Sequence, residues 1–330
     1  MNDTLFQNVI GQSKTKRELN FYLDAYPFTR MIPNLLVSAP KGGGKNTIIN
    51  AMVGGLYEFD AEGKVRMIPS KDDPAVMLMK RKPVVEIDCP KVKNLKGFMA
   101  IIHKHVHEKD VSVVLDESSE LPHNVQMALL TMLNPNPTHK NTFEIDDYVY
   151  EFDFRRQSFI FATSEIHKMF HALVDRLERI TLDEYSLDEL AKIVQLGLPN
   201  VNFEDDVLME VATVLRGNGR GAQKMSEKIL SYLKGSDTFL KDDWTALKDV
   251  LSIAPLGLNA IEIQILRHLA ANPSGTSLTA LSAKTGMSRN ALQLDGELYL
   301  QKHSLLSIEP TGRMITSKGL DYLKKLTETI

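Results

Sequence analysis

The sequence has few of the residues that build disulfide frameworks, metal clusters or membrane spans. Its 330 residues include one cysteine, Cys89, which excludes an internal disulfide and a cysteine-based metal site and is typical of a reducing compartment. No apolar run approaches the ~18 residues that a membrane-spanning helix requires. The opening stretch "MNDTLFQNVIGQ" lacks a signal-peptide pattern. We therefore expect a cytoplasmic protein with no membrane association.

The chain also lacks a strong excess of either charge. Its formal net charge is −3, so bulk attraction to nucleic acid or to an anionic membrane is not expected. Any contact with nucleic acid must come from a local basic patch. Apolar residues make up 43% and charged residues 25% of the chain, as in ordinary globular proteins, and the length allows two or three domains.

The first part of the chain, residues 1–182, alternates short apolar runs with segments of helical periodicity. The expected strands are Asn34–Ser38, Val84–Asp88, Val111–Leu115 and Ser158–Ala162. The expected helices are Ser13–Ala25, Lys45–Leu56, Leu95–His107 and Pro122–Leu133. Short apolar strands between helices are typical of a parallel sheet covered on both faces. The sequence therefore predicts an α/β fold here.

Two inserts interrupt this alternation. Residues 57–82 are polar and contain two proline-bounded turns, which indicates a surface excursion. Residues 142–154, "TFEIDDYVYEFDF", alternate apolar and polar side chains on both sides of Asp146 and Asp147. That pattern predicts a β-hairpin.

The rest of the chain is mainly helical. In residues 183–252, Ser186 and Glu189 have capping-box spacing, and no strand pattern is convincing. Residues 253–330 predict three helices, at Asn259–Ala271, Ser277–Thr285 and Ser288–Lys302, followed by two short strands around Thr311–Gly312. This order is that of a helix-turn-helix with a wing. We therefore expect three domains: residues 1–182, 183–252 and 253–330.

The segment Ala39–Thr47, "APKGGGKNT", lies between an expected strand and an expected helix. A phosphate-binding P-loop reads G-x-x-x-x-G-K-[ST] in that context. Its glycines let successive backbone N–H groups face phosphate oxygens, and its lysine reaches the β- and γ-phosphates. The expected nucleotide-binding residues of this loop are Pro40, Lys41, Gly42, Gly43, Gly44, Lys45, Asn46 and Thr47. A glycine-rich turn at a helix start is the alternative.

A second motif, "VSVVLDESSELP", ends an apolar strand in Asp116 and Glu117. Ligands of parallel sheets gather at the carboxyl ends of strands. Asp116 is placed to orient Mg²⁺ through water, and Glu117 to polarise the attacking water. A solvated turn is the alternative for an isolated Asp-Glu pair, but the two motifs in this order indicate an NTPase that binds ATP and Mg²⁺.

With these motifs, the opening "FQNVIGQSKTKRELNFYLDAY" resembles that of the AAA+ ATPases, in which the I-G-Q turn borders the adenine pocket. The chain resembles most the RuvB family of Holliday-junction branch-migration motors. The likeness covers nearly the whole length and includes the hairpin, "FIFATSEIHKMFHALVDRLERI", the "RGNGRGAQK" turn and the terminal wing. It implies an AAA+ nucleotide-binding domain (residues 1–182), a helical lid (183–252) and a winged helix (253–330).

The resemblance also implies roles for individual residues. Thr163 matches the sensor-1 position, with Ser164 as the alternate, and would hydrogen-bond the γ-phosphate or the attacking water. Arg176 matches the arginine finger, which would reach the nucleotide of a neighbouring subunit. For Thr163 the alternative is a threonine of a strand-end turn. For Arg176 it is a surface arginine paired with Asp175 or Glu178.

On the lid side, Arg220 matches sensor 2 and would contact the phosphates. Tyr185, with Val9 and Ile10 of the I-G-Q turn, would pack against the adenine. The Arg-Pro pair that often precedes this turn in the family is missing, which weakens the carry-over for base recognition.

The P-loop departs from the family pattern at two positions. Ala39 replaces the first glycine, and Asn46 replaces the hydroxyl residue that ligates Mg²⁺. An asparagine carbonyl is an acceptable hard ligand but is longer, and Thr47 comes one residue too late to substitute. We expect Asn46 and Asp116 to hold the metal, nucleotide binding to survive, and Mg²⁺ affinity and hydrolysis to be reduced.

Residues 253–330 carry a small excess of Lys and Arg, whereas the rest of the chain is acidic on balance. Arg289, Lys302 and Arg313, the last at the expected wing tip, suit contact with DNA phosphates without base readout. A winged helix used for protein contact is the alternative. In the family, the hairpin docks the junction-binding partner RuvA, so hairpin 142–154 is expected to bind a RuvA-like protein.

The resulting hypothesis is an ATP-driven translocase of duplex DNA, working as a homo-oligomeric ring, most simply a hexamer, at Holliday junctions. Two alternatives remain. One is a nucleotide switch of the clamp-loader or initiator type. The other is a scaffold whose Asn46 permits ATP binding without turnover.

Overall fold

The computed structural model describes residues 5–133, 140–145, 148–153 and 157–328. The chain divides into two compact units. The first comprises Met1–Glu189 and the short segment Gly217–Arg220, and the second comprises Leu190–Arg216 and Gly221–Ile330. This division leaves the expected lid and winged helix in one unit, so the three-domain boundaries remain a prediction.

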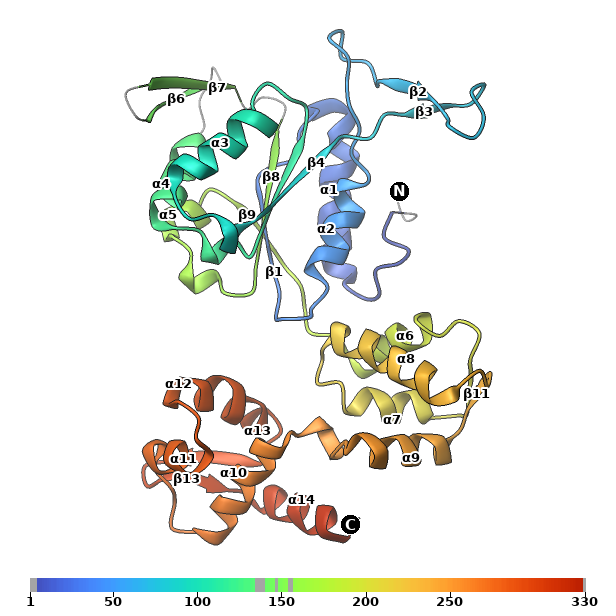
Figure 1. Ribbon diagram of the computed structural model, residues 1–330, viewed down its shortest axis with the longest axis vertical. Coiled ribbons are helices and arrows are strands. Elements are labelled where there is room, and N and C mark those ends of the chain that lie inside the picture. Colours follow the sequence, from blue (N-terminus) through green and yellow to red (C-terminus); the bar gives the residue numbers. More distant parts are fainter. Residues whose placement is uncertain (1–4, 134–139, 146–147, 154–156, 329–330) are drawn as a thin grey trace. The chain divides into compact units, whose positions relative to one another are not determined.

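The first unit is built on a five-stranded parallel sheet with strand order β4-β5-β8-β1-β9 (Figure 1). Its strands are β1 (Leu35–Ser38), β4 (Val84–Asp88), β5 (Ser112–Asp116), β8 (Ser158–Thr163) and β9 (Glu178–Thr181). The first four confirm the expected strands. The order places β1 beside β8, and β8 beside β5, so the ends of these three strands share one edge.

Helices cover both faces of this sheet (Figure 1). They are α1 (Ser13–Thr29), α2 (Lys45–Val53), α3 (Leu95–His105), α4 (His123–Met132) and α5 (His171–Val174). Alternate strand residues enter two separate cores: Val113 and Leu115 pack with Phe98 of α3, whereas Val114 packs with Ile48 of α2. This two-sided burial confirms the doubly covered α/β fold.

Strand β9 was not expected from the sequence. Of its four residues only Ile180 is buried, so it lacks both the continuous apolar run of a central strand and regular alternation. Its pairing with β1, in which Leu35 lies opposite Glu178, makes it an edge strand. Edge position explains why its polar residues are tolerated.

The insert 57–82 is a surface excursion, as expected, and it forms a two-stranded arm. Strands β2 (Met67–Pro69) and β3 (Met77–Met79) pair antiparallel, and an isolated bridge joins Tyr57 to Arg81. The base of the arm is fixed by aromatic packing, because the rings of Tyr57 and Phe59 lie 5.3 Å and 5.6 Å from that of Tyr26. Both strands of the arm are exposed.

The second expected insert is the predicted hairpin. Strands β6 (Lys140–Ile145) and β7 (Tyr148–Asp153) pair antiparallel, with Thr142 opposite Glu151. Asp146, Asp147 and Phe154 lie outside the described residues.

The second unit begins with a helical group. Its members are α6 (Leu187–Leu196), α7 (Val207–Thr213), α8 (Gly219–Leu233) and α9 (Lys241–Leu251); the first residues of α6 and α8 belong to the first unit. The expected capping box is present, because the amide of Glu189 donates to Ser186 Oγ at 3.2 Å and the amide of Ser186 to Glu189 Oε2 at 2.8 Å. A two-residue parallel ladder, β10 (Asn202–Phe203) with β11 (Thr238–Phe239), was not expected.

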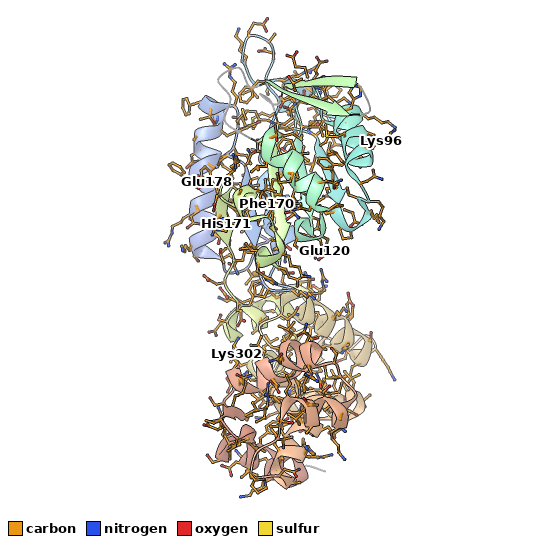
Figure 2. The ribbon with its side chains drawn as sticks, turned by 90° about the vertical axis from the view of Figure 1, so that its left-hand side faces the viewer. Lys96, Glu120, Phe170, His171, Glu178 and Lys302 are labelled. Atoms are coloured by element: carbon orange, nitrogen blue, oxygen red, sulfur yellow. The ribbon has the colours of Figure 1, made fainter. Side chains whose placement is uncertain are left out.

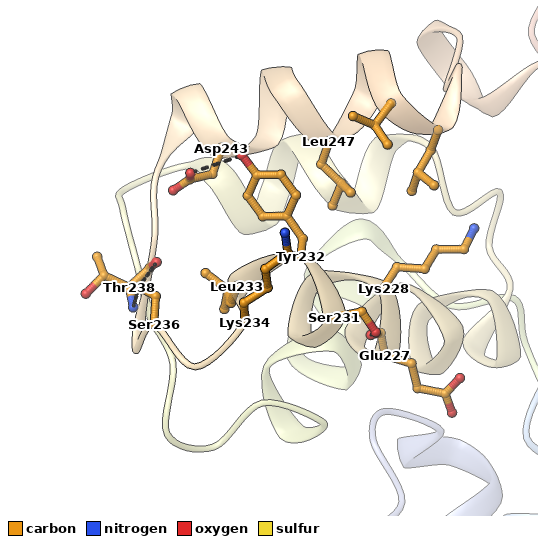
Figure 3. Close-up of a pocket in the computed structure, with 12 residues that line it drawn as sticks. Glu227, Lys228, Ser231, Tyr232, Leu233, Lys234, Ser236, Thr238, Asp243 and Leu247 are labelled. Atoms are coloured by element: carbon orange, nitrogen blue, oxygen red, sulfur yellow. Dashed lines mark hydrogen bonds between the residues drawn. The ribbon is translucent and has the colours of Figure 1, made fainter.

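Between α8 and α9 lies an open groove of about 870 Å³ (Figure 3). Tyr232 lines it and donates a hydrogen bond to Asp243 Oδ1 at 3.4 Å. Among the described residues no single helix is long and apolar enough to cross a membrane. The bent pair Lys241–Gly257 and Ala260–Ala271 reaches the required length and composition only when both arms are counted.

The last part of the chain is a winged helix around a leucine-rich core that includes Leu266, Leu281 and Leu300. Its elements are α10 (Ala260–Ala271), α11 (Leu278–Thr285), α12 (Arg289–Ala291), a π-helical segment (Leu292–Glu297), α13 (Leu298–Lys302), β12 (Leu306–Glu309), β13 (Gly312–Ile315) and α14 (Ser317–Glu328). The π-helical segment and α14 were not expected from the sequence. Tyr322 and Leu326 of α14 complete the core.

Candidate nucleotide site at the carboxyl edge of the sheet

The glycine-rich loop joins the end of β1 to the start of α2. Gly42 and Gly44 have φ values of 78° and 86°, a backbone conformation that other residues adopt only with strain. A Cβ on Gly44 would lie 2.3 Å from the hydroxyl of Tyr185, and one on Gly43 would lie 2.9 Å from the Cβ of Ala39. The loop therefore requires glycine for both its turn and its close contacts.

Lys45 opens α2 and points back under this loop. Its side chain is buried, and its Nζ donates to the carbonyl of Ala39 at 3.1 Å. Burial lowers its pKa from the ordinary 10.5, opposed by the nearby carboxylates of Glu117 and Asp116. Pro40 and Lys41 before it, and Asn46 and Thr47 after it, are exposed. A buried ammonium of this kind is suited to pairing with an incoming anion.

Asp116 ends β5, and its side chain contacts the first turn of α2. Asn46 Nδ2 donates to Asp116 Oδ2 at 3.3 Å, so the two expected metal ligands are neighbours. Both line a cavity of about 100 Å³ together with Asn50 and Glu86, two polar residues that sequence reasoning missed. Glu117 follows with φ of 52°, and its amide donates to Asp116 Oδ1 at 3.0 Å.

Thr163 ends β8 opposite Ser38 of β1. Its side chain is fully buried and accepts a hydrogen bond from the amide of Glu165 at 3.0 Å. Its carbonyl accepts from the amide of Ala39, which joins the end of β8 to the glycine loop. The neighbouring hydroxyl of Ser164 is buried and has no hydrogen-bond partner among the residues that the structure describes. The structure therefore gives the alternate sensor, Ser164, an unused hydroxyl at this edge.

Arg176 follows α5 and is exposed. Its guanidinium donates to the carbonyl of Ala172 at 3.0 Å. Asp175, its neighbour in the chain, pairs with Arg179 at 3.2 Å. Figure 2 shows this part of the unit, with Phe170 and His171 labelled at the start of α5.

The turn Gly217–Arg220 lies against the glycine loop, which sequence reasoning did not foresee. The amide of Gly219 donates to the carbonyl of Gly42 at 3.0 Å, and Asn218 Nδ2 donates to the carbonyl of Lys41 at 3.4 Å. Arg220 is exposed, and its charge helps to lower the pKa of Lys45. The expected sensor-2 residue thus lies within electrostatic reach of the P-loop lysine.

Tyr185 also belongs to this cluster. Its ring would lie 2.7 Å from a Cβ on Gly219, so it packs on both glycine segments, and burial raises the pKa of its phenol.

The I-G-Q turn anchors the chain beside β9. Gln12 donates through Nε2 to the carbonyl of Asp183 at 2.8 Å and accepts from the Asp183 amide at 3.1 Å. Val9 is buried in the core shared with α2, whereas Ile10 is partly exposed. Sequence reasoning did not identify Gln12 as a residue that positions the site. The signal that could have identified it is its position directly after Gly11, whose φ of 64° marks a turn.

The residues present fit a magnesium nucleotide. The loop is a cradle that any side chain would fill, a buried ammonium lies beside it, and Asn46 and Asp116 offer oxygen atoms at a small cavity. Within the described ranges, no group of three or more His, Cys, Asp and Glu side chains is placed to hold a metal ion. Mg²⁺ commonly uses one or two protein ligands plus water and phosphate oxygens, so two suffice.

The three expected DNA-binding residues occupy different environments. Arg289 is exposed at the start of α12, and Lys302, labelled in Figure 2, is exposed at the end of α13. Arg313 is not at the tip of the wing: it lies in β13, and its side chain is 13% exposed. It binds the buried Glu297 through two hydrogen bonds of 2.8 Å and 3.2 Å. This ion pair holds the Arg313 guanidinium against Glu297 and corrects its expected place at the tip of the wing.

Comparisons with known proteins agree with this architecture. Residues 255–324 match the model of the RuvB C-terminal winged helix domain. The Holliday junction branch migration complex subunit RuvB of Ehrlichia canis (strain Jake) is 26% identical over 97% of this chain and 92% of its own length. The protein of the same name from Campylobacter hominis is 23% identical over 97% and 89%.

Solved structures share the fold. The structure described as the Thermotoga maritima RuvB Holliday junction branch migration motor has a TM-score of 0.72, with 21% identity and coverage of 96% of this chain and 95% of that one. Three findings agree: residues 255–324 match the RuvB winged helix domain, the chain is similar to RuvB proteins over nearly its whole length, and it shares the fold of the solved RuvB motor.

Proposed function

We propose that this protein is an ATP-dependent motor that translocates duplex DNA and drives branch migration of Holliday junctions as a homo-oligomeric ring. One observation carries the proposal: the glycine cradle with Lys45 lies on the same sheet edge as Asp116, Glu117 and Thr163. The DNA substrate is inferred from the relatives, which are named as subunits of the Holliday junction branch migration complex.

In this proposal each residue of the edge has a separate task. The loop amides and Lys45 bind the phosphates, Asn46 and Asp116 hold Mg²⁺, and Glu117 polarises the attacking water. Bound Mg²⁺ would neutralise charge that develops on the transferred phosphoryl group. Thr163 or Ser164 would orient the water or γ-phosphate, Arg220 would contact the phosphates, and Tyr185 would pack on the base.

Arg176 would act on the nucleotide of the next subunit, which makes the ring, most simply a hexamer, part of the catalytic site. Arg289 and Lys302 would contact DNA phosphates without reading sequence, which suits a motor that must move any sequence. The β6–β7 hairpin would bind a RuvA-like partner.

The decisive experiment measures ATP turnover with and without duplex DNA, and unwinding of a four-way junction. Lys45→Ala should abolish turnover, because an oxyanion of the phosphates loses its buried partner. Lys14→Ala is the control: this lysine is exposed and lies outside the loop, and we expect a loss of less than about threefold, under ~1 kcal/mol. Wild-type protein without saturable ATP binding would refute the motor.

A specific contact favours a second candidate, a scaffold that binds ATP without turning it over. Asn46 occupies the metal-ligand position and already donates its amide to Asp116. ATP binding with no turnover in the wild type, and junction binding without unwinding, would favour this scaffold over the motor.

A further inference from the structure

Residues 216–220 lead from the loop after α7 into the first turn of α8, and they make contacts in both units. Gly217–Arg220 belong to the first unit by their contacts, whereas Arg216 belongs to the second. One of the three boundaries between the units therefore falls at the peptide bond between Arg216 and Gly217. A segment held tightly on both sides of one bond passes displacement from one side to the other.

On one side, the segment is fixed to the glycine loop. Gly219 donates its amide to the carbonyl of Gly42, and Asn218 donates to that of Lys41. The Asn218 side chain also lies close to the loop, because a Cβ on Gly42 would be 2.1 Å from its Oδ1. A movement of the carbonyls of Lys41 or Gly42 would therefore act on these two hydrogen bonds.

On the other side, Arg216 is fixed to the winged helix. Its guanidinium donates to both carboxylate oxygens of Glu262, at 3.1 Å and 2.8 Å, and lies 3.7 Å from the ring centre of Tyr299. Glu262 is fully buried and also accepts the amide of Asn259, which caps α10. Arg216 thus supplies the charge that this buried carboxylate at the start of α10 requires.

The backbone between the two anchors has an unusual conformation. Arg216 and Gly217 have φ values of 58° and 70°, both in the left-handed region. A non-glycine residue is strained there and stays so only when its surroundings hold it. Adjacent Cα atoms are ~3.8 Å apart, so little slack exists between Arg216 and the loop contacts.

We infer that Arg216 is a positioning residue that couples nucleotide occupancy of the glycine loop to the winged helix, through Glu262 and Tyr299. The inference rests on the proposed nucleotide site and adds to it a residue in the second unit, which pairs with the winged helix rather than with the loop. Coupling of this kind is reciprocal: nucleotide changes DNA affinity and DNA changes nucleotide affinity by the same factor.

The test replaces the ion pair without leaving a buried charge. In the double variant Arg216→Gln with Glu262→Gln, both side chains are neutral, which avoids the penalty of an unpaired carboxylate. The matched control is Arg313→Gln with Glu297→Gln, a second buried two-bond pair of the winged helix that is not on the segment. Both variants are made in the full-length protein.

Two readouts are measured with ATPγS and Mg²⁺. The first is the ratio of duplex-DNA Kd values without and with nucleotide, and the second is nucleotide-dependent amide hydrogen exchange over residues 258–263. In the wild type we expect a ratio of about fivefold or more. The Arg216/Glu262 variant should bring it below about twofold and abolish the exchange change, while the control keeps both.

Full coupling in the Arg216/Glu262 variant, or equal loss in the control, would overturn the inference. So would a wild-type protein in which nucleotide leaves exchange at residues 258–263 unchanged, whether or not it moves junctions. A different result separates the two proposals. If nucleotide changes amide exchange at residues 258–263 in the wild type but the protein does not drive branch migration, the motor is refuted and the coupling is supported.

Discussion

Asn46 is the residue of the proposed metal site that departs from the P-loop pattern. Its amide nitrogen, a hydrogen-bond donor, faces Asp116 at 3.3 Å, so the carbonyl oxygen must be presented to a metal while the nitrogen stays on the carboxylate. A serine or threonine hydroxyl would ligate Mg²⁺ directly and is shorter. The choice of residue at position 46 therefore affects Mg²⁺ binding more than phosphate binding, because the phosphates are bound by the loop backbone and Lys45.

We predict that Asn46→Thr raises Mg²⁺-dependent ATP turnover by on the order of tenfold, about 1.4 kcal/mol. The reason is that a hydroxyl restores a direct metal ligand. Titrating turnover against Mg²⁺ measures the effect. Asn46→Ala, which removes both oxygen and nitrogen, is the comparison and should lie below the wild type. A threonine variant no faster than the alanine variant would show that position 46 does not hold metal.

Arg313 is a second single residue whose role depends on burial. Its partner Glu297 lies in the π-helical segment and is 1% exposed, so truncating the arginine strands a buried charge. We predict that Arg313→Ala destabilises the winged helix by about 3–5 kcal/mol, measured by denaturant unfolding.

Arg289→Ala provides the contrast, because Arg289 is exposed. We expect its unfolding free energy to stay within about 0.5 kcal/mol of the wild type. The salt dependence of DNA binding should fall by about one phosphate contact. Loss of DNA affinity in Arg313→Ala without loss of stability would contradict this assignment.

At the scale of elements, the arm formed by β2 and β3 is the clearest departure from a compact domain. Its strands expose Met67, Ile68, Met77, Leu78 and Met79, each at 41–50%. An isolated two-stranded ribbon is marginal in water, so its attachment must come from its base. That base is the aromatic group of Tyr26, Tyr57 and Phe59.

We predict that replacing residues 67–79 by a short turn leaves the melting temperature within about 2 °C of the wild type, because the removed side chains are exposed. Phe59→Ala should cost about 1–3 kcal/mol, since the ring packs on Tyr26 and under Arg30. Thermal unfolding of both variants decides this. A large destabilisation by the shortened arm would mean that the ribbon supports the fold.

At the scale of the whole molecule, the proposed catalytic site is incomplete in one chain. Arg176 is exposed in the first unit, and a finger that acts between subunits would place each site at the junction of two copies. ATP turnover would then require assembly of the ring.

Mixing experiments test this directly. We predict that Lys45→Ala and Arg176→Ala proteins each turn over less than about 1% of wild-type ATP, a loss of ~2.7 kcal/mol or more. A mixture should recover activity, because Lys45→Ala subunits donate an intact Arg176 to the intact loops of their neighbours. Phosphate release across mixing ratios measures it. Mixed rings without any recovery would show that Arg176 does not act across subunits.

The sequence by itself determined the order of the main elements and most of the candidate site. Strong local signals were sufficient there: glycines followed by lysine after an apolar strand, an acidic pair at a strand end, and periodic apolar helices. The expected elements do not include β9, because only Ile180 of that strand is buried. They also do not include α14, the helix that follows the wing.

Only the tertiary structure decided which polar side chains meet. The contacts of Asn46 with Asp116, Gly219 with Gly42, Arg216 with Glu262 and Arg313 with Glu297 join residues far apart in the chain. Local propensity and hydrophobic period carry no information on such pairs, because each depends on strand order, helix packing and burial. The sequence therefore defined the phosphate cradle, whereas the folded chain selected the charges around it and committed Arg313 to the interior.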